Sequence, residues 1–190
     1  MKIYKLIPTI ILTILVLCSC TPIWSVKLQP IEPVSGEKGI VFDKRSSEDK
    51  EFRYVDFLKL SYKYYLADKN TTPDRISILK SRLINTNLAD LKIEVSKFDI
   101  LSDTSGSACK GCALAAVSSS AATIATADEK PGDDTFTCSL IASVNGVSHS
   151  SEVLVPYRVR GFEGMGSQPV KIALQECINE VIDRWITSTH

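Results

Sequence analysis

Cysteine and histidine are the residues best suited to chemistry in this chain of 190 residues, which holds six cysteines and two histidines. The cysteines fall into three sets by spacing: Cys18 with Cys20, Cys109 with Cys112, and the separate Cys138 and Cys177. The residues around each set decide which chemistry that set could do. The sequence contains no GxSxG motif and no other catalytic set, so we expect no enzyme.

The first cysteine pair follows an apolar run of about a dozen residues, which is the length of a signal peptide rather than of a membrane span. The stretch Leu17-Cys18-Ser19-Cys20 resembles the bacterial lipobox, with leucine at −3 and a small residue at −1 relative to Cys20. Cys18 does not fit, because the bulky Leu17 precedes it. The resemblance implies lipidation at Cys20 after removal of residues 1–19, with acyl chains such as palmitate as the anchor. The alternatives are an uncleaved signal anchor and a secreted protein without lipid.

The resemblance also implies a location in the cell. Thr21, rather than aspartate, follows the lipidated cysteine, which favours the bacterial outer membrane with the domain facing the periplasm. Removal of Lys2 and Lys5 with the signal peptide leaves 20 basic against 22 acidic residues, a formal charge of −2. That balance does not indicate a nucleic-acid partner. An oxidising compartment also favours disulfides at the remaining cysteines.

Composition divides the mature chain into a tether and one domain. Residues 20–38 hold three prolines and little periodicity, which predicts a tether, with a short extended piece at 23–28. Residues 39–187 form the predicted domain. Within it, residues 102–134 are a low-complexity insertion dominated by small side chains.

The sequence of the domain predicts a succession of strands and helices. Ile40–Phe42 predicts a strand, and the charged Asp43–Arg45 that follows predicts a solvated turn. The stretch 52–66 fits a strand or a helix, and we favour the strand. Thr72 predicts a helix cap with Pro73 in the first helical position. Asn145-Gly146 predicts a type I′ hairpin turn.

Two further patterns complete the fold. Residues 91–101 alternate as a strand whose phase slips by one place, which predicts a bulge near Ser96–Lys97. Pro156 places the second hairpin strand at a sheet edge or in a bulge. Residues 169–190 have the apolar stripe of an amphipathic helix. The sequence therefore predicts an α+β fold, a mainly antiparallel sheet with two amphipathic helices on one face.

Two cysteine interpretations and one tyrosine cluster remain as candidate sites. Cys109 and Cys112 predict a local disulfide or two incidental thiols, with redox chemistry or metal binding as alternatives; we expect no metal and no cofactor. Cys138 and Cys177 lie on the apolar faces of a predicted strand and a predicted helix. They could form a disulfide across that interface or remain two buried thiols. Tyr54, Tyr62, Tyr64 and Tyr65 form a candidate docking surface, with sheet packing as the alternative.

Three stretches carry a family resemblance: LKIEVSKFDIL, the hairpin CSLIASVNGVSHSSEVLVPYRVRGF, and the closing helix VKIALQECINEVIDRW. Together they are similar to the YajG-like outer-membrane lipoproteins and, more loosely, to envelope lipoproteins that act as transporter auxiliaries. The resemblance covers about half of the mature chain and implies a periplasm-facing α+β domain without established catalysis. The insertion and the cysteines depart from the family pattern.

The interpretation that unites these features is a lipid-anchored accessory or assembly subunit of the cell envelope, without catalytic activity. We expect it to bind the membrane through its anchor and an envelope protein through the sheet edge or the aromatic segment 52–66. The alternatives are a carrier of a small hydrophobic ligand between sheet and helices and, with less support, a thiol–disulfide protein using Cys109 and Cys112.

Overall fold

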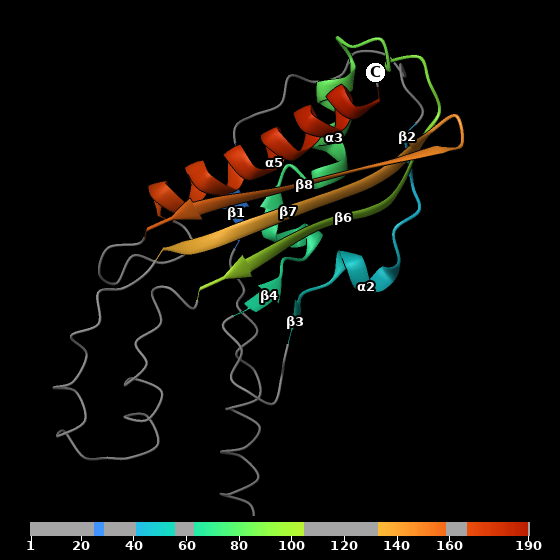
Figure 1. Cartoon of the computed structure of the whole chain (residues 1–190). Helices are drawn as coiled ribbons and strands as arrows, with labels where there is room; N and C mark the ends of the chain where they lie inside the picture. The colour runs from blue at the N-terminus through green and yellow to red at the C-terminus, as the bar shows by residue number, and fades with distance from the viewer. Residues whose placement is uncertain (1–24, 29–40, 56–62, 105–132, 159–166, 190) are drawn as a thin grey trace, which may run out of the picture.

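The computed structural model describes residues 25–28, 41–55, 63–104, 133–158 and 167–189. Its strands are β1 (Val26–Lys27), β2 (Val41–Asp43), β3 (Arg53–Tyr54), β4 (Lys63–Tyr65), β5 (Thr71–Thr72), β6 (Ile93–Asp103), β7 (Asp134–Val144) and β8 (Val147–Tyr157). Its helices are α2 (Ser47–Lys50), α3 (Arg75–Leu83) and α5 (Gln168–Ser188), with a 3-10 turn, η2, at Asp68–Asn70. The fold is α+β, with a mainly antiparallel sheet whose apolar face packs against α3 and α5 in one core, as predicted (Figure 1).

The main sheet has the strand order β3-β4-β6-β7-β8, and β2 adds to it by pairing with β6. β2 runs parallel to β6 and pairs with Ile93–Val95, whereas β4 runs antiparallel and pairs with Leu101–Asp103. β7 pairs with one edge of β6, so β2 and β4 both pair with the opposite edge. β2 pairs near the start of β6 and β4 near its end, and the middle residues of that edge pair with neither strand. β1 and β5 form a separate parallel pair.

The β7–β8 hairpin follows from its turn. Asn145 and Gly146 have φ values of 51° and 87°, the left-handed conformation that a type I′ turn requires and that asparagine and glycine tolerate. Both strands are eleven residues long and pair without a register shift. The bulge expected near Ser96–Lys97 is also confirmed, since the β6–β7 register shifts between Val95 and Lys97.

The helices bury the predicted stripes. In α5 the buried residues are Val170, Ala173, Leu174, Cys177, Ile178, Val181, Ile182 and Trp185. α3 starts later than predicted: Asp74, not Thr72, is its cap and accepts a hydrogen bond from the Ser77 N–H at 3.0 Å. Thr72 lies two residues before this cap and pairs with Lys27 between β1 and β5, and the Thr72–Pro73 peptide bond is cis.

Several predicted boundaries shift. β6 continues through Ser102 and Asp103, which the sequence assigned to the insertion at 102–134, and β7 begins at its last residue, Asp134. Val26 belongs to the predicted tether, yet it is fully buried in the core. In the ambiguous stretch 52–66, the described ends are the extended β3 and β4, and residues 56–62 lie outside the described residues.

The core lies between the sheet and the two helices. Trp185, Phe98 and Phe136 are among its largest fully buried side chains, and β7 contributes every second residue to it. Within the described ranges, no helix is both long and apolar enough to cross a membrane.

Candidate functional site

The predicted tyrosine surface is partly assembled at the β3 edge of the sheet. β3 and β4 pair Tyr54 with Tyr64, and Phe52 joins them. The ring centroids lie 5.1 Å apart for Phe52 and Tyr54, 5.2 Å for Phe52 and Tyr64, and 6.2 Å for Tyr54 and Tyr64. Tyr54 is 41% exposed and Val55 is 51% exposed, so the cluster reaches the surface. We call Phe52, Tyr54, Val55 and Tyr64 the aromatic edge.

The other two predicted tyrosines do not join the aromatic edge. Tyr65 pairs with Arg53, whose guanidinium carbon lies 4.3 Å from the centre of the Tyr65 ring. That geometry is a cation–π contact. Tyr62 lies outside the described residues.

The phenols near this end of the sheet are poor bases and nucleophiles. Burial raises the pKa of Tyr64, and burial also raises the pKa of Tyr157, with the Asp134 carboxylate adding to both shifts. The Ser102 hydroxyl opposes the shift in each case. Both tyrosines are therefore protonated at neutral pH.

A second feature, which the sequence did not predict, fills the gap between β2 and β4 along β6. In this gap the Lys44 N–H donates to the Val95 carbonyl and the Leu66 N–H donates to the Ile100 carbonyl, each at 2.9 Å. The Phe98 carbonyl between them accepts a hydrogen bond from the Arg75 guanidinium instead of from a strand. Because an unpaired buried carbonyl is costly, Arg75 replaces a missing strand residue.

Asp68 holds two buried guanidiniums together. It accepts hydrogen bonds from Arg75 Nε at 2.8 Å and from Arg45 Nη1 and Nη2 at 3.0 and 2.8 Å. Arg45 also forms a two-point pair with Asp43, through Nε at 2.9 Å and Nη2 at 3.1 Å. Arg45 and Arg75 are only 5% and 1% exposed, whereas the carboxylates of Asp43 and Asp68 remain partly open to solvent. We call Asp43, Arg45, Asp68 and Arg75 the charged cluster.

The charges of this cluster shift one another's pKa values. Partial burial opposes the change, but hydrogen bonds from Arg45 and Lys50 lower the pKa of Asp43 to about 2. Burial lowers the pKa of Arg75, against the attraction of Asp68. The pKa of Arg45 is raised by Asp43 and Asp68 despite its burial. The four charges are paired within the chain, so loss of one partner would leave a buried charge uncompensated.

Two signals in the sequence pointed to this cluster. The solvated turn expected at Asp43–Arg45 is found for Asp43 and Lys44, which are exposed, but not for Arg45, which is buried and pairs with Asp68, 23 residues beyond it. Arg75 begins a helix, where a basic residue opposes the helix dipole. That misfit is the signal that Arg75 has a partner elsewhere.

Asp99 lies beside the charged cluster on β6. It pairs with Arg53 Nη2 at 3.2 Å, and the same Nη2 lies 3.3 Å from Asp49. Burial and the nearby Asp49 carboxylate raise the pKa of Asp99, although Arg53 opposes the shift. This pair fixes Arg53 in its position over Tyr65 and so connects β6 to the aromatic edge.

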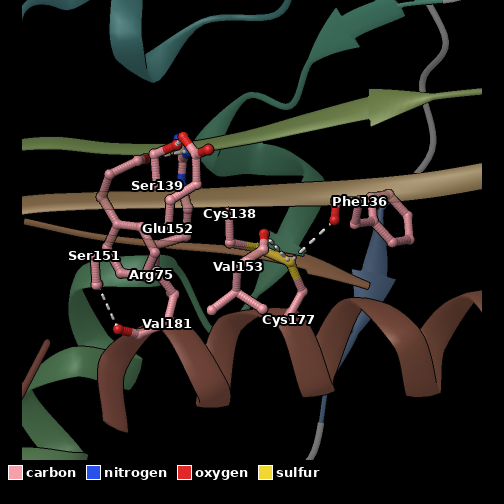
Figure 2. The surroundings of a disulfide bond; sticks show 10 residues. Arg75, Phe136, Cys138, Ser139, Ser151, Glu152, Val153, Cys177 and Val181 are labelled. Carbon is pink, nitrogen blue, oxygen red and sulfur yellow. Dashed lines mark hydrogen bonds between the residues drawn. A yellow bond between two sulfur atoms is a disulfide. The ribbon is translucent and has the colours of Figure 1, made fainter. Parts of the chain in front are cut away.

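Cys138 and Cys177 form a disulfide between β7 and α5, with 5.9 Å between their Cα atoms. Both cysteines are fully buried. Figure 2 shows the bond between sheet and helix, with Ser151 Oγ donating to the Val181 carbonyl at 2.7 Å beside it. The disulfide interpretation is thereby preferred to two free thiols. Cys20, Cys109 and Cys112 lie outside the described residues.

A groove of about 690 Å³ runs along the solvent side of α5 next to β1. Eight of its ten lining residues have polar or charged side chains, and the lining comprises Lys27, Leu28, Gln168, Lys171, Ile172, Gln175, Glu176, Asn179, Glu180 and Asp183. Among the residues that the structure describes, no three histidine, cysteine, aspartate or glutamate side chains gather in a way that would hold a metal ion.

Comparisons of the chain with family models, with curated proteins and with solved structures give no match. The resemblance to YajG-like lipoproteins stays a prediction. The functional proposal therefore depends on the chemistry of this chain.

Proposed function

We propose that this chain is a lipid-anchored lipoprotein of the outer membrane, whose periplasmic domain acts as a non-catalytic accessory or interaction subunit. The observation that supports it is the aromatic edge, where three rings contact one another at the end of the sheet and remain partly exposed. Clustered aromatic side chains are the commonest anchors of protein interfaces. The partner would be an envelope protein held near the same membrane.

The aromatic edge is also held in place, which favours binding. Tyr64 lies in a strand paired to β6, and Tyr54 lies in a strand paired to Tyr64. On the neighbouring residue, Arg53 is fixed between Tyr65, Asp49 and Asp99. Rings that are ordered before binding lose less conformational entropy when a partner covers them.

The alternatives gain no such support. A carrier needs an apolar cavity between sheet and helices, whereas the groove described above lies outside α5 and has charged walls. The large side chains between sheet and helices, such as Trp185 and Phe136, are fully buried in one contiguous core. Thiol–disulfide chemistry would need Cys109 and Cys112, and the Cys138–Cys177 disulfide is buried away from substrates.

Site-specific photo-crosslinking in intact cells tests the interaction role. A photoreactive phenylalanine analogue at position 54 should give a crosslinked species of one defined mass. The same analogue at Ile172, which is 57% exposed on α5, is the matched control and should give none. Equal crosslinking at the two positions, or none at position 54, would contradict the proposal.

The membrane anchor has a separate test. Cells fed an alkyne-labelled palmitate should label the wild-type chain, and Cys20→Ser should abolish both the label and sedimentation with the outer membrane. Cys18→Ser should change neither. Labelling that survives Cys20→Ser would refute the lipobox interpretation without affecting the aromatic edge.

A further inference from the structure

The outer edge of β8 presents hydrogen-bonding groups to solvent. The two residues that flank a two-residue turn, here Val144 and Val147, form a hydrogen-bonded pair. Along an antiparallel ladder, hydrogen-bonded pairs alternate with pairs that are not hydrogen-bonded to each other. The odd-numbered residues of β8 therefore bond to β7. The N–H and C=O groups that point away from the sheet are those of Ser148, Ser150, Glu152 and Leu154.

These outward groups have no partner within the described ranges, where no backbone bond outside the β7–β8 ladder involves them. Pro156 belongs to the same alternating set and has no N–H to offer, so it ends the open stretch. The available edge is thus the seven residues Ser148–Leu154. Its length is that of a typical strand.

The usual protections of an edge strand are scarce on this stretch. Edges are normally guarded by charges, bulges or shortness, but β8 is eleven residues long, in continuous register, with one carboxylate. That carboxylate, on Glu152, accepts a hydrogen bond from Ser139 Oγ at 2.9 Å on the neighbouring strand. Leu154, two residues on and on the same face, is 61% exposed.

The position of α5 determines what can occupy the edge. α5 lies along β8, where Ser151 Oγ contacts the Val181 carbonyl at 2.7 Å and Trp185 Nε1 donates to the His149 carbonyl at 3.2 Å (Figures 1 and 2). In a two-fold pair of β8 strands, about 5 Å apart, the two α5 helices would need the roughly 8–10 Å that packed helices require. A second copy of this chain would bring two α5 helices together on one face of the joined sheet, whereas a bare strand brings no helix, so the bare strand is the occupant that suits this edge.

We propose that the β8 edge binds an extended segment of another protein, which adds to the sheet as an antiparallel strand. Main-chain hydrogen bonds to Ser148, Ser150, Glu152 and Leu154 supply the affinity. Specificity comes from cross-strand pairs on the open face: an apolar residue opposite Leu154 and, two residues later, a lysine or arginine opposite Glu152. This mode of binding goes beyond the aromatic edge and uses none of its residues.

The test is amide hydrogen exchange by NMR on the full mature chain, in detergent micelles. The probe is the acetylated, amidated heptapeptide Ile-Thr-Lys-Thr-Thr-Thr-Val at millimolar concentration, with isoleucine designed to face Leu154 and lysine to face Glu152. We expect the Ser150 and Glu152 amides to exchange at least about tenfold more slowly with peptide, while the Ser151 and Val153 amides, already bonded to β7, do not change. No added protection of Ser150 and Glu152 would overturn the proposal.

Two controls separate the hydrogen bonds from other causes. Ser150→Pro removes an outward N–H and should weaken the peptide by about tenfold, whereas Ser150→Ala keeps that N–H and should bind within about twofold of wild type. A heptapeptide N-methylated at residues 3 and 5 should fail to bind wild-type protein. Because this control uses the wild-type chain, it does not depend on how any variant folds. Binding of the methylated peptide as tightly as the parent would refute strand addition.

Two further outcomes decide the occupant. Replacing the peptide's lysine by glutamate should weaken binding by about fivefold, because it would oppose Glu152. Protection of the Ser150 and Glu152 amides without peptide, rising with protein concentration, would show pairing between copies and overturn the chosen occupant. Each result is independent of crosslinking at position 54.

Discussion

On one side of the sheet, β8 contributes eleven consecutive residues to a single ladder with β7, closed by a two-residue turn. On the other side, β6 receives three residues from β2, three from β4 and, between them, a guanidinium from Arg75. The hairpin side is assembled by backbone groups close in sequence. The charged side is assembled by side chains that bring together segments more than twenty residues apart.

The difference has a functional consequence. On the charged side, Lys44, Leu66 and Arg75 donate to the carbonyls of Val95, Ile100 and Phe98, so these three acceptors of β6 are occupied within the chain. On the hairpin side, a full set of outward backbone groups remains for another strand. The first side therefore offers side chains to a partner, through the aromatic edge, and the second offers its backbone.

Replacement of Arg75 by leucine is the strongest test of the charged side. Arg75→Leu leaves the Phe98 carbonyl without its donor and removes a cation beside Asp68, so we expect a loss of about 3–5 kcal/mol of unfolding free energy. Urea unfolding followed by the fluorescence of the buried Trp185 measures it. Arg82→Leu is the control, because Arg82 pairs with the exposed Asp183 and should cost less than about 1 kcal/mol. Equal losses in the two variants would refute the role of Arg75 in the sheet gap.

The disulfide is the corresponding test of the hairpin side. It closes a sequence separation of 39 residues between β7 and α5, so replacing both Cys138 and Cys177 by alanine should destabilise the chain by about 2–4 kcal/mol. The melting temperature should also fall in reducing buffer for the wild type and stay constant for the double variant. The control replaces Cys109 and Cys112 by serine, in the segment that the sequence reads as low-complexity, and should leave the wild-type melting temperature unchanged. A wild type insensitive to reductant would contradict a stabilising role.

The dependence of stability on acid pH should also differ between the charged side and the hairpin side. The folded-state pKa of Asp43 is about 2 against an ordinary value of 3.8, so its ionised form is favoured in the fold. The resulting stability is present above about pH 4 and is lost as pH falls towards 2. Asp43→Asn should therefore be less stable at pH 7 and lose less stability over that pH range. Asp133→Asn, which removes an exposed partner of Arg158, is the control and should keep the wild-type profile.

The two sides also differ in how far the sequence predicts them. The Asn145-Gly146 turn, the alternation of β7, the bulge at Ser96–Lys97 and the stripe of α5 are local patterns, and the structure confirms them. Arg45 and Arg75 could not be predicted as buried, because their burial depends on Asp68 and on a sheet gap created by two distant strands. The aromatic edge was predicted as a tyrosine cluster. Which tyrosines belong to it depends on the β3–β4 register, which pairs Tyr54 with Tyr64 and places Tyr65 opposite Arg53.

The turn itself gives the smallest expected effect and the sharpest test of local origin on the hairpin side. Gly146 has φ of 87°, and a Cβ there would meet no atom within 4 Å, so Gly146→Ala should cost about 1 kcal/mol through the backbone conformation alone. Gly146→Asn should cost less, because asparagine tolerates left-handed φ. Urea midpoints give both values, and exchange of the Val144 and Val147 amides locates the change at the turn. If asparagine costs as much as alanine, the loss does not come from the left-handed backbone conformation, and the local account of this hairpin fails.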